Sequence, residues 1–498
     1  MRIFLTTILA AAAMTVSAQT LVHPVVGAKS TPADAPVSIT LATKHVNFTG
    51  AAKEYIDEYI NSPKSANIHP DGTKYYVNSL EGCATVVYDM KTHERLKVIH
   101  YDFKDGKDDA LWSKPSEFYP FTHYTENLNT FQGKPVESTF SHGGRYLWIP
   151  FYRRTYDLNA QDPSAIAVVD TRTDEIVKLM ETGPLPKMVA CSHDGKHIAI
   201  THWGNNTVGL VNVESLDPDK WYHEKLLVVD YVLPLNFSLT KSVDRDNDSG
   251  YCLRGTVFTP DDRYLLVGCM GNNGGIAVID MQTQEYLGRV MGMMANVRHL
   301  VIRDGYLYLS INRAGYVQRI KLDKFMDAAH NISGKTATLQ GWESCQVGEG
   351  ARTIELSPSG KFVFAACNLA SKLYVVDTRT MKQVCNIDVD SYPVGLDISN
   401  DGKYVIVTSQ GRSNKGGNAV NIYEVDYDEP EPVLKDTDGA AVLKQSASPD
   451  STQNANVLPG AGKSTPGNTG YYIAGGVAAI LAFALFIWLR KKQKRQLA

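Results

Sequence analysis

The sequence predicts an all-β protein, a seven-bladed β-propeller followed by one C-terminal transmembrane helix. Three observations predict this architecture. A phrase with apolar strands on either side of a Ser-Pro-Asp-Gly-like turn recurs about seven times between residues 64 and 426. Each phrase has the length of one four-stranded blade, as in RTIELSPSGKFVFAACNLASKLYVVDTRTMKQVCNI from residue 352 to residue 387. An uncharged apolar stretch lies near the C-terminus. Because one blade cannot bury both of its faces alone, repeated blades stack into a ring.

The first residues have the pattern of a signal peptide. Arg2 precedes an apolar run that extends to Val16, and Val16-Ser17-Ala18 is the small-residue pattern that a signal peptidase accepts. We therefore expect residues 1–18 to be removed and the mature chain to begin at Gln19. The alternative, a short buried helix, suits these flanks less well.

Seven turns between the first and second strands of the blades define the repeat, and we expect the propeller to occupy residues 19–435. They begin at His69, Ser141, Ser192, Thr259, Arg303, Ser357 and Ser399. Most combine Pro, Asp and Gly, which tight turns select for a fixed φ or a positive φ. Closing such a ring requires a strand from one terminus, for which we predict residues 37–43.

Several strand-and-turn phrases resemble the YVTN-repeat β-propeller family. They are IAVVDTRTDEIVKLMETG (166–183), THWGNNTVGLVNV (201–213), IAVIDMQTQEYLGRVMG (276–292) and LYVVDTRTMKQVCNI (373–387). That family includes archaeal surface-layer proteins and bacterial periplasmic propellers. The resemblance covers most of residues 60–426. It implies a binding scaffold on a propeller fold, and it implies no fixed chemistry.

Two connections, residues 101–133 and 217–250, are longer than a blade needs. Both join the last strand of one blade to the first strand of the next, so we expect both to overhang one face of the disc, which we call the top face. They are rich in aromatic residues, among them Trp112 and Trp221. Long loops in compact domains are often functional. The alternative is that these aromatic side chains cover blade edges.

A basic ring is the sharpest chemical signal in the chain. The first position of each innermost strand is Lys64, Val136, Lys187, Arg254, Arg298, Arg352 and Val394. Five of these seven positions are basic, although Lys and Arg supply only 50 of 498 residues. Turns on the same face add Arg153, Arg154, Arg313, Arg412 and Lys415. Like charges around one opening favour an anionic ligand. In the alternative interpretation, carboxylates such as Glu137 and Glu349 neutralise the ring.

No cofactor is predicted, and calcium is the alternative. Asp244, Asp246 and Asp248 alternate as in a calcium loop, but Gly250 comes one place late and Gly255 stands where a bidentate Glu belongs. The chain has no GxSxG, HExxH, P-loop or CxxCH motif. Its seven cysteines form no CxxC pair, and their odd number leaves at least one thiol unpaired. The histidines are scattered, and we expect His142 and His193 to be exposed in turns.

The C-terminal region predicts a membrane anchor. Residues 436–470 are rich in Ser, Pro, Gly, Asn and Gln and form a flexible linker. Residues 471–489 are uncharged, and nineteen residues are enough to cross a hydrocarbon core of about 30 Å. The basic residues that follow, in the tail 490–498, place that tail in the cytoplasm. Residues 458–462 also resemble a sortase signal, but Ala461 stands where that signal has Thr.

These expectations combine into a single-pass cytoplasmic-membrane protein with its propeller in the periplasm or at the cell surface. The sequence favours a non-enzymatic binding or scaffold module whose partner is an anionic glycan, a wall polymer or a protein. An enzyme of the lactonase or quinoprotein-dehydrogenase type is one alternative. A nucleic-acid-binding propeller is another, although the net charge of −3 gives it no support.

Overall fold

The computed structural model describes residues 21–434 apart from 120–129, 156, 158–159, 161, 235–248, 273 and 413–414. The predicted signal peptide (1–18), linker (436–470), transmembrane helix (471–489) and basic tail (490–498) lie outside the described residues. Within the described part of the chain, no helix has the length and apolar character needed to cross a membrane.

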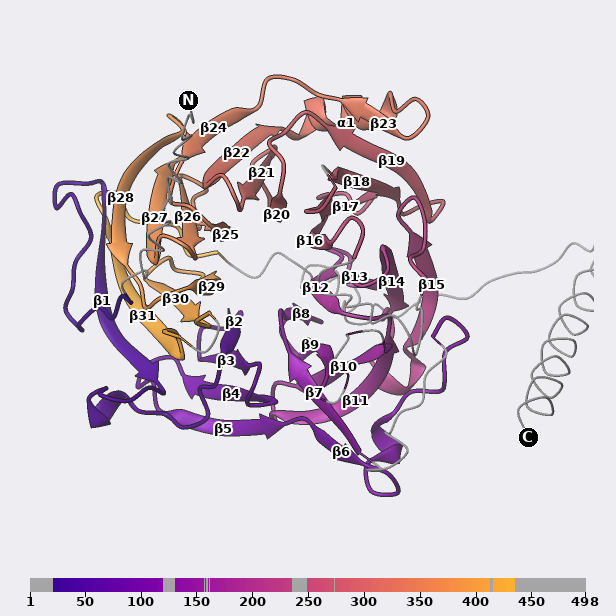
Figure 1. Ribbon diagram of the computed structural model, residues 1–498, viewed down its shortest axis with the longest axis horizontal. Coiled ribbons are helices and arrows are strands. Elements are labelled where there is room, and N and C mark those ends of the chain that lie inside the picture. Colours follow the sequence, from indigo (N-terminus) through magenta and orange to yellow (C-terminus); the bar gives the residue numbers. More distant parts are fainter. Residues whose placement is uncertain are drawn as a thin grey trace, which may run out of the picture. The chain divides into compact units, whose positions relative to one another are not determined.

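The described residues form seven sheets, each built on an antiparallel meander, arranged as blades around one axis with the innermost strands facing the middle (Figure 1). This confirms the predicted seven-bladed propeller. Blades 1 to 3 contain β2 (Pro63–Ile68), β3 (Lys74–Ser79), β4 (Ala84–Asp89) and β5 (Arg95–His100); β8 (Thr139–Ser141), β9 (Tyr146–Arg154), β10 (Ser164–Asp170) and β11 (Glu175–Thr182); and β12 (Pro186–Cys191), β13 (His197–His202), β14 (Thr207–Asn212) and β15 (Tyr222–Val228).

Blades 4 to 7 repeat the same meander. They contain β16 (Leu253–Phe258), β17 (Tyr264–Cys269), β18 (Gly275–Asp280) and β19 (Glu285–Met291); β20 (Val297–Arg303), β21 (Tyr306–Ile311), β22 (Tyr316–Lys321) and β24 (Glu343–Gln346); β25 (Ala351–Leu356), β26 (Phe362–Cys367), β27 (Lys372–Asp377) and β28 (Lys382–Asp388); and β29 (Pro393–Ile398), β30 (Tyr404–Ser409), β31 (Ala419–Tyr427) and β1 (Val37–Val46).

The N-terminal strand closes the ring. β1 pairs antiparallel with β31, from Val37 opposite Tyr427 to Val46 opposite Ala419, and so supplies the outer strand of blade 7. Val37, Ile39 and Leu41 are fully buried against blade 6. The predicted closing strand, residues 37–43, is therefore confirmed, and it extends three residues further.

The tight turns between the first two strands adopt the predicted backbone. Gly72, Gly195, Gly305, Gly360 and Gly402 have φ between 71° and 73°. Blade 4 has Asp262 at this position, with φ 54°. Its carboxylate accepts hydrogen bonds from the His193 and Asp194 amides of the neighbouring turn, at 2.8 and 2.7 Å. Asp262 therefore links blades 3 and 4 on the bottom face, opposite the top face.

Some elements have no counterpart in the sequence prediction. β6 (Asp102–Lys104) pairs with β7 (Thr130–Pro135), which pairs with β9. After β22 the chain forms α1 (Leu322–His330) and then β23 (Thr336–Thr338), which joins blade 4 in parallel with β19 before the chain returns to β24. Three single-turn 3-10 helices, η1 (Lys53–Tyr55), η2 (Asp109–Leu111) and η3 (Pro218–Lys220), lie in connections.

The described parts of the two long connections lie largely at blade edges. Trp112 forms a parallel bridge to Leu179 of β11, so the first connection covers the outer edge of blade 2. Phe103 and Phe131 pack with Phe151 in the same core cluster. The range 217–250 contains β15, so the second connection begins only after Val228. The interpretation that the aromatic residues cover blade edges therefore holds for these side chains.

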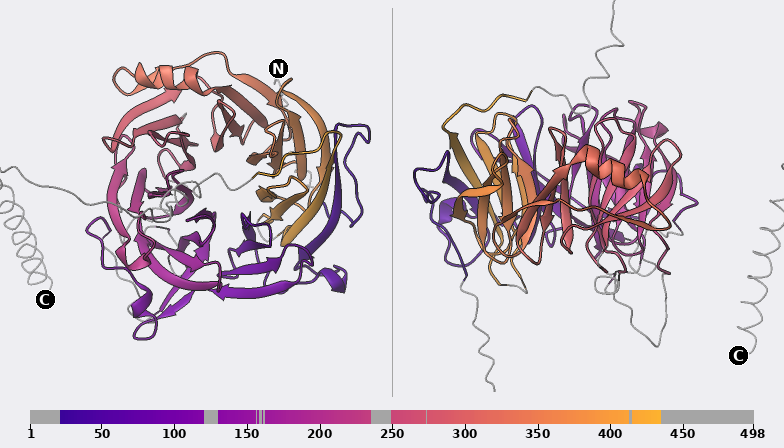
Figure 2. Two further views of the ribbon diagram at one scale, coloured as in Figure 1. Left: turned by 180° about the vertical axis from the view of Figure 1, so that it is seen from behind. Right: turned by 90° about the horizontal axis from the view of Figure 1, so that it is seen from above.

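The core lies between neighbouring blades rather than within one blade. One cluster joins Val208 and Leu210 of blade 3 to Leu265 and Val267 of blade 4, and similar clusters follow around the ring. The seven cysteines are free thiols, and five of them are buried in this packing. Two further views show the flat disc that results (Figure 2).

Candidate anion site in the middle of the propeller

A β-bulge positions each residue of the basic ring, by which we mean Lys64, Lys187, Arg254, Arg298 and Arg352. In six blades the pairing of the first two strands shifts register at this position, for example between Ala351 and Thr353 around Arg352. A bulge leaves one residue out of the ladder and re-aims its side chain. The repeat therefore re-aims the side chain at the same position of these six innermost strands.

Hydroxyl groups of the preceding blade hold three of these bulges in place. The Thr408 hydroxyl donates to the Lys64 carbonyl at 3.0 Å, and the Ser310 hydroxyl donates to the Arg352 carbonyl at 2.6 Å. The Thr201 hydroxyl reaches the Arg254 carbonyl at 3.4 Å. Each donor lies on the second strand of its blade, so the backbone of the ring is fixed by its neighbours.

The five basic side chains interact electrostatically across the middle. Lys64, Lys187, Arg254 and Arg352 are more than nine-tenths buried, and Arg298 is partly buried. Burial, followed by the charges of the neighbouring arginines, lowers the pKa of Lys64 and of Lys187 well below the ordinary value of a lysine. The same causes lower the pKa values of Arg298 and Arg352. Arg254 and Arg352 thus destabilise the charged forms of Lys64, Lys187 and Arg298.

Few described groups compensate this charge. Lys64 donates from Nζ to Gln410 Oε1 at 3.0 Å, and Arg298 Nη1 lies 3.2 Å from Met270 Sδ. Lys187 Nζ lies 3.5 Å from the centre of the Tyr152 ring and 5.0 Å from that of Trp203. Among the described residues, no carboxylate lies within salt-bridge distance of Lys64, Arg298 or Arg352.

Glu137 is the carboxylate that acts on the ring. It stands beside Val136, where blade 2 lacks a basic residue, and it opposes the lowering of the pKa values of Lys64, Arg298 and Arg352. Glu349, the other carboxylate that the sequence suggested, is exposed and forms no ion pair with a described residue. One carboxylate therefore opposes several cations.

The basic residues of the turns do not all join the ring. Arg153 stacks on Tyr152 at 5.2 Å, next to Lys187. Arg154 is instead buried over Phe131 at 5.4 Å, with Asp157 and Asp162 nearby. Arg313 is exposed. Arg412, which is bridged to Lys415 through the backbone, lines a cavity of about 500 Å³ that Gln410 also lines.

Sequence reasoning missed three titratable groups on the innermost strands. Burial raises the pKa of Asp397 to about 7, and the charge of Glu355 on the neighbouring blade adds to this. Burial lowers the pKa of His299, next to Arg298, to about 4. Glu355 and Asp397 occupy the same position in blades 6 and 7, three residues after the ring position. This shared spacing from the ring position is the signal by which the sequence could have revealed Glu355 and Asp397. Residues three places further along a strand lie deeper in the propeller than the ring position does.

Two other predicted features fare differently. The candidate calcium ligands Asp244, Asp246 and Asp248 lie outside the described residues. Among the residues that are described, no group of three or more His, Cys, Asp or Glu side chains gathers to hold a metal.

The two turn histidines are less exposed than the sequence predicted. His142, expected to be exposed, instead packs on Trp221 and lies 3.2 Å from the Ser215 carbonyl. His193 is partly buried and bonded to Asp262 at 2.9 Å.

Comparison with known proteins supports the fold. No family model matches the chain. Antigen Lp49 of Leptospira interrogans serogroup Icterohaemorrhagiae serovar copenhageni (strain Fiocruz L1-130) is 24% identical over 209 residues, which are 38% of this chain and 41% of that protein. The match thus spans less than half of the curated relative. The solved structure of Kuenenia stuttgartiensis hydrazine synthase superposes with a TM-score of 0.51 at 12% identity, covering 78% of this chain and 100% of that one. At that identity the similarity shows a shared propeller fold and nothing finer.

Proposed function

We propose that this protein is a non-enzymatic binding module whose basic ring takes up an anionic ligand or an acidic segment of a protein partner. The ligand classes that suit it are an anionic glycan, a wall polymer and an acidic peptide. The predicted signal peptide and membrane anchor would hold the propeller outside the cytoplasm on a flexible stalk.

The mutual destabilisation of the ring is the observation that carries this proposal. Basic side chains from five blades occupy the same position of their innermost strands, and the charges of Arg254 and Arg352 lower the pKa values of Lys64, Lys187 and Arg298. An anion placed among them would reverse that effect, and it would bind in a site whose backbone the neighbouring blades already fix. A preorganised site of this kind requires little rearrangement on binding.

The test is a thermal-shift screen of the full-length chain against phosphate, heparin, polyglutamate and wall teichoic acid. Wild type is compared with a variant that carries Arg254→Ser, Arg298→Ser and Arg352→Ser. A matched control carries Lys91→Ser, Arg379→Ser and Lys382→Ser, which remove the same charge from exposed positions. A ligand at a hundred times its Kd adds about 2.7 kcal/mol to the stability of the native state.

We expect one anion class to stabilise wild type and the exposed control equally and to leave the ring variant unchanged. The proposal fails if no anion stabilises wild type. It also fails if the exposed control loses the effect as completely as the ring variant. A single-stranded oligonucleotide included in the screen tests nucleic-acid binding, which would show a steep loss of affinity with salt.

Asp397 supports a second candidate function, an enzyme of the lactonase type. A carboxyl group with a pKa near 7 is suited to general acid–base work, and here it lies on β29, the innermost strand of blade 7, between the innermost strands of blades 6 and 1 that carry Arg352 and Lys64. Hydrolysis of a lactone panel by wild type, abolished in Asp397→Asn, would support this reading. Equal turnover by the two proteins would exclude Asp397 from catalysis.

A further inference from the structure

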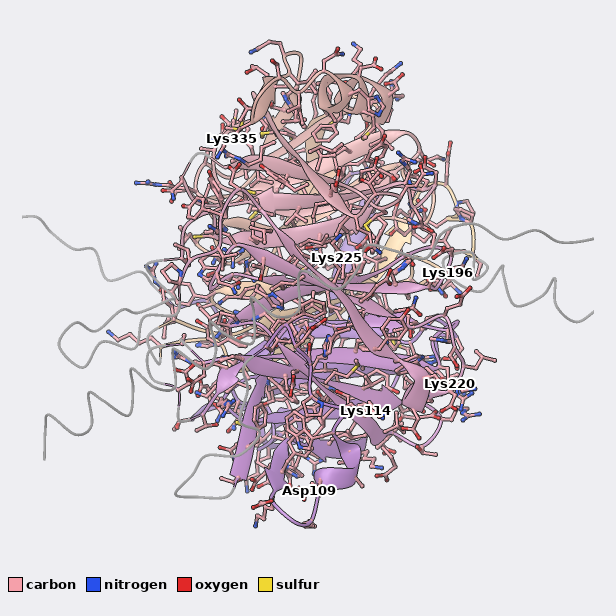
Figure 3. The ribbon with its side chains drawn as sticks, turned by 90° about the vertical axis from the view of Figure 1, so that its right-hand side faces the viewer. Asp109, Lys114, Lys196, Lys220, Lys225 and Lys335 are labelled. Carbon is pink, nitrogen blue, oxygen red and sulfur yellow. The ribbon has the colours of Figure 1, made fainter. Side chains whose placement is uncertain are left out.

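A second candidate site lies on the outer wall of the propeller. A cavity of about 720 Å³ is bounded by residues 110–118 of the first long connection, by β11 of blade 2, and by the segment that enters β15 of blade 3. Its volume falls within the usual range of ligand sites. Figure 3 looks onto this side of the molecule, on which Lys114 and Lys220 of the cavity lining are labelled.

Two tryptophans form the apolar floor of this cavity. The Ser113 amide donates to the Leu179 carbonyl at 2.8 Å, which attaches the connection to β11 and places Trp112 beside it. Trp221 packs on Trp148 with ring centres 5.1 Å apart, and its indole donates to the Ser215 carbonyl at 2.6 Å. Both cavity tryptophans are more than nine-tenths buried, so their rings are held rigidly.

Polar atoms in the cavity lining lack hydrogen-bond partners. The Ser113 hydroxyl and both ring nitrogens of His223 are shielded from solvent and have no partner among the described residues. His142, in contrast, is within hydrogen-bond distance of Ser141 and Ser215. A buried polar group left without a partner costs roughly 1–3 kcal/mol. Because no hydrogen bond holds either side chain in its rotamer, turning toward a ligand would break none.

The charges of this lining nearly balance, unlike those of the basic ring. Three lysines, Lys114, Lys178 and Lys220, face two carboxylates, Glu117 and Asp219. Lys178 Nζ lies 2.6 Å from Asp219. Beyond these charges, the cavity presents to a ligand the Ser113 hydroxyl, the His223 imidazole, which can donate and accept hydrogen bonds, and the apolar floor. Ligand hydroxyl groups, which also donate and accept, are their natural complement.

We propose that this outer cavity binds a neutral saccharide, with hydroxyl groups on Ser113 and His223 and its apolar face toward the two tryptophans. This site is separate from the basic ring. β11 and β15 are the outermost strands of their blades, and three strand spacings, roughly 14 Å, separate them from the innermost strands. Its ligand also belongs to a different chemical class from the one proposed for the ring.

The experiment is calorimetric titration of the full-length chain with maltose, cellobiose and N,N′-diacetylchitobiose, with glucuronic acid as the anionic probe. His223→Phe keeps the ring and removes both nitrogens, and Ser113→Ala removes the hydroxyl. His100→Phe, which makes the same change at an exposed histidine of blade 1, is the matched control. Because the deleted atoms have no hydrogen-bond partner among the residues that the structure describes, His223→Phe and Ser113→Ala should melt at or above the wild-type temperature. Their affinity for the bound disaccharide should fall about tenfold or more.

Binding of one disaccharide that His100→Phe leaves intact and both cavity variants weaken would support the proposal. It is overturned if none of the disaccharides binds at millimolar concentration, or if only glucuronic acid binds. It is equally overturned if binding survives in the double variant Ser113→Ala, His223→Phe. Destabilisation of both single variants would also overturn it, since the deleted atoms would then have a structural role. None of these results bears on whether the basic ring binds anions.

Discussion

Asp397 makes stability depend on pH in the direction opposite to that of most carboxylates. Its folded-state pKa of about 7 lies above the ordinary value of 3.8, because burial outweighs the hydrogen bonds from the Ile68 and Ile398 amides. Between these two values the folded state binds a proton that the unfolded state does not. Asp397 therefore contributes stability below about pH 4 that is lost as the pH rises through about 7.

We expect Asp397→Asn to change this dependence. Relative to wild type, the variant should gain up to about 4 kcal/mol in unfolding free energy between about pH 4 and about pH 8, because about three pKa units are removed. Urea unfolding at the two pH values measures this gain. Asp426→Asn, at an exposed position, is the control and should show a flat difference. If the unfolding free energies of wild type and Asp397→Asn change equally between the two pH values, Asp397 does not take up the proton.

The lowered pKa values of Lys64 and Lys187 predict proton uptake when an anion binds. An anion restores the charged form of these lysines, so affinity should fall as the pH rises through their lowered pKa values, well before an ordinary lysine titrates at about 10.4. Calorimetry in two buffers of different ionisation enthalpy measures the uptake. The double variant Lys64→Met, Lys187→Met should lose it, whereas Lys91→Met should retain it. Equal heats in the two buffers would contradict the prediction.

At the scale of the elements, the closing strand β1 should be sensitive to loss of apolar volume. Leu41 is fully buried between blades 6 and 7. We expect Leu41→Ala to lower the free energy of unfolding by about 2–4 kcal/mol, because it removes apolar contact and leaves a cavity. Ser38→Ala, on the partly exposed face of the same strand, should change it by less than about 0.5 kcal/mol. Similar urea midpoints for the two variants would show that the packing between blades 6 and 7 tolerates the cavity.

The hydroxyl groups that bond to the bulges of the next blade should affect ligand binding as well as stability. The Ser310 hydroxyl donates to the Arg352 carbonyl and accepts from the His299 amide at 3.0 Å. Ser310→Ala should cost about 1–3 kcal/mol, because two buried partners lose their hydrogen bond, and should weaken anion binding several-fold by loosening the Arg352 bulge. Unfolding and titration experiments on one preparation measure both effects. If Ser310→Ala lowers stability but leaves the affinity for the anion unchanged, the Ser310 hydroxyl has a structural role only.

The blades and the ring positions could be predicted because their signals are local. A tight turn selects Pro, Asp and Gly, and a fixed spacing from that turn then identifies Arg254, Arg298 and Arg352. The bulges that aim these residues could not be read, because a register shift depends on the partner strand. The outer cavity was also beyond the sequence, since it forms only when residues 110–118 pair with β11.

For the whole molecule, four histidines with lowered pKa values, of which His202 is fully buried and the other three are partly buried, predict sensitivity to acid. Burial lowers the pKa values of His45, His223 and His299 to about 4 and that of His202 to about 3. Below about pH 6.5 the unfolded state binds protons that these folded-state histidines do not. Each therefore contributes stability that is lost as the pH falls from about 6.5 toward 4, at up to about 1.4 kcal/mol per pH unit.

We expect the midpoint of urea unfolding to fall steeply over this pH range, with Asp397 offsetting part of the loss. Replacing His202 does not test this cleanly, because His202 accepts from the Gly183 amide and bonds to Thr207. His223→Phe is the better probe, since it removes one titration without removing a hydrogen bond. A variant as acid-sensitive as wild type would show that His223 is already protonated in the folded state.

The closure of the ring also determines how the propeller responds to tension. Val37 lies opposite Tyr427, so the chain enters and leaves blade 7 at the same end of the β1–β31 pair. Pulling at these two points, once the contacts of Thr31 with Asn386 and of Val22 with Ser391 have given way, loads the hydrogen bonds one after another. Strands loaded in this way unzip, whereas strands pulled from opposite ends must break all their bonds together. The β1–β31 pair would thus offer little mechanical resistance when the two ends are drawn apart, and blade 7 would open first.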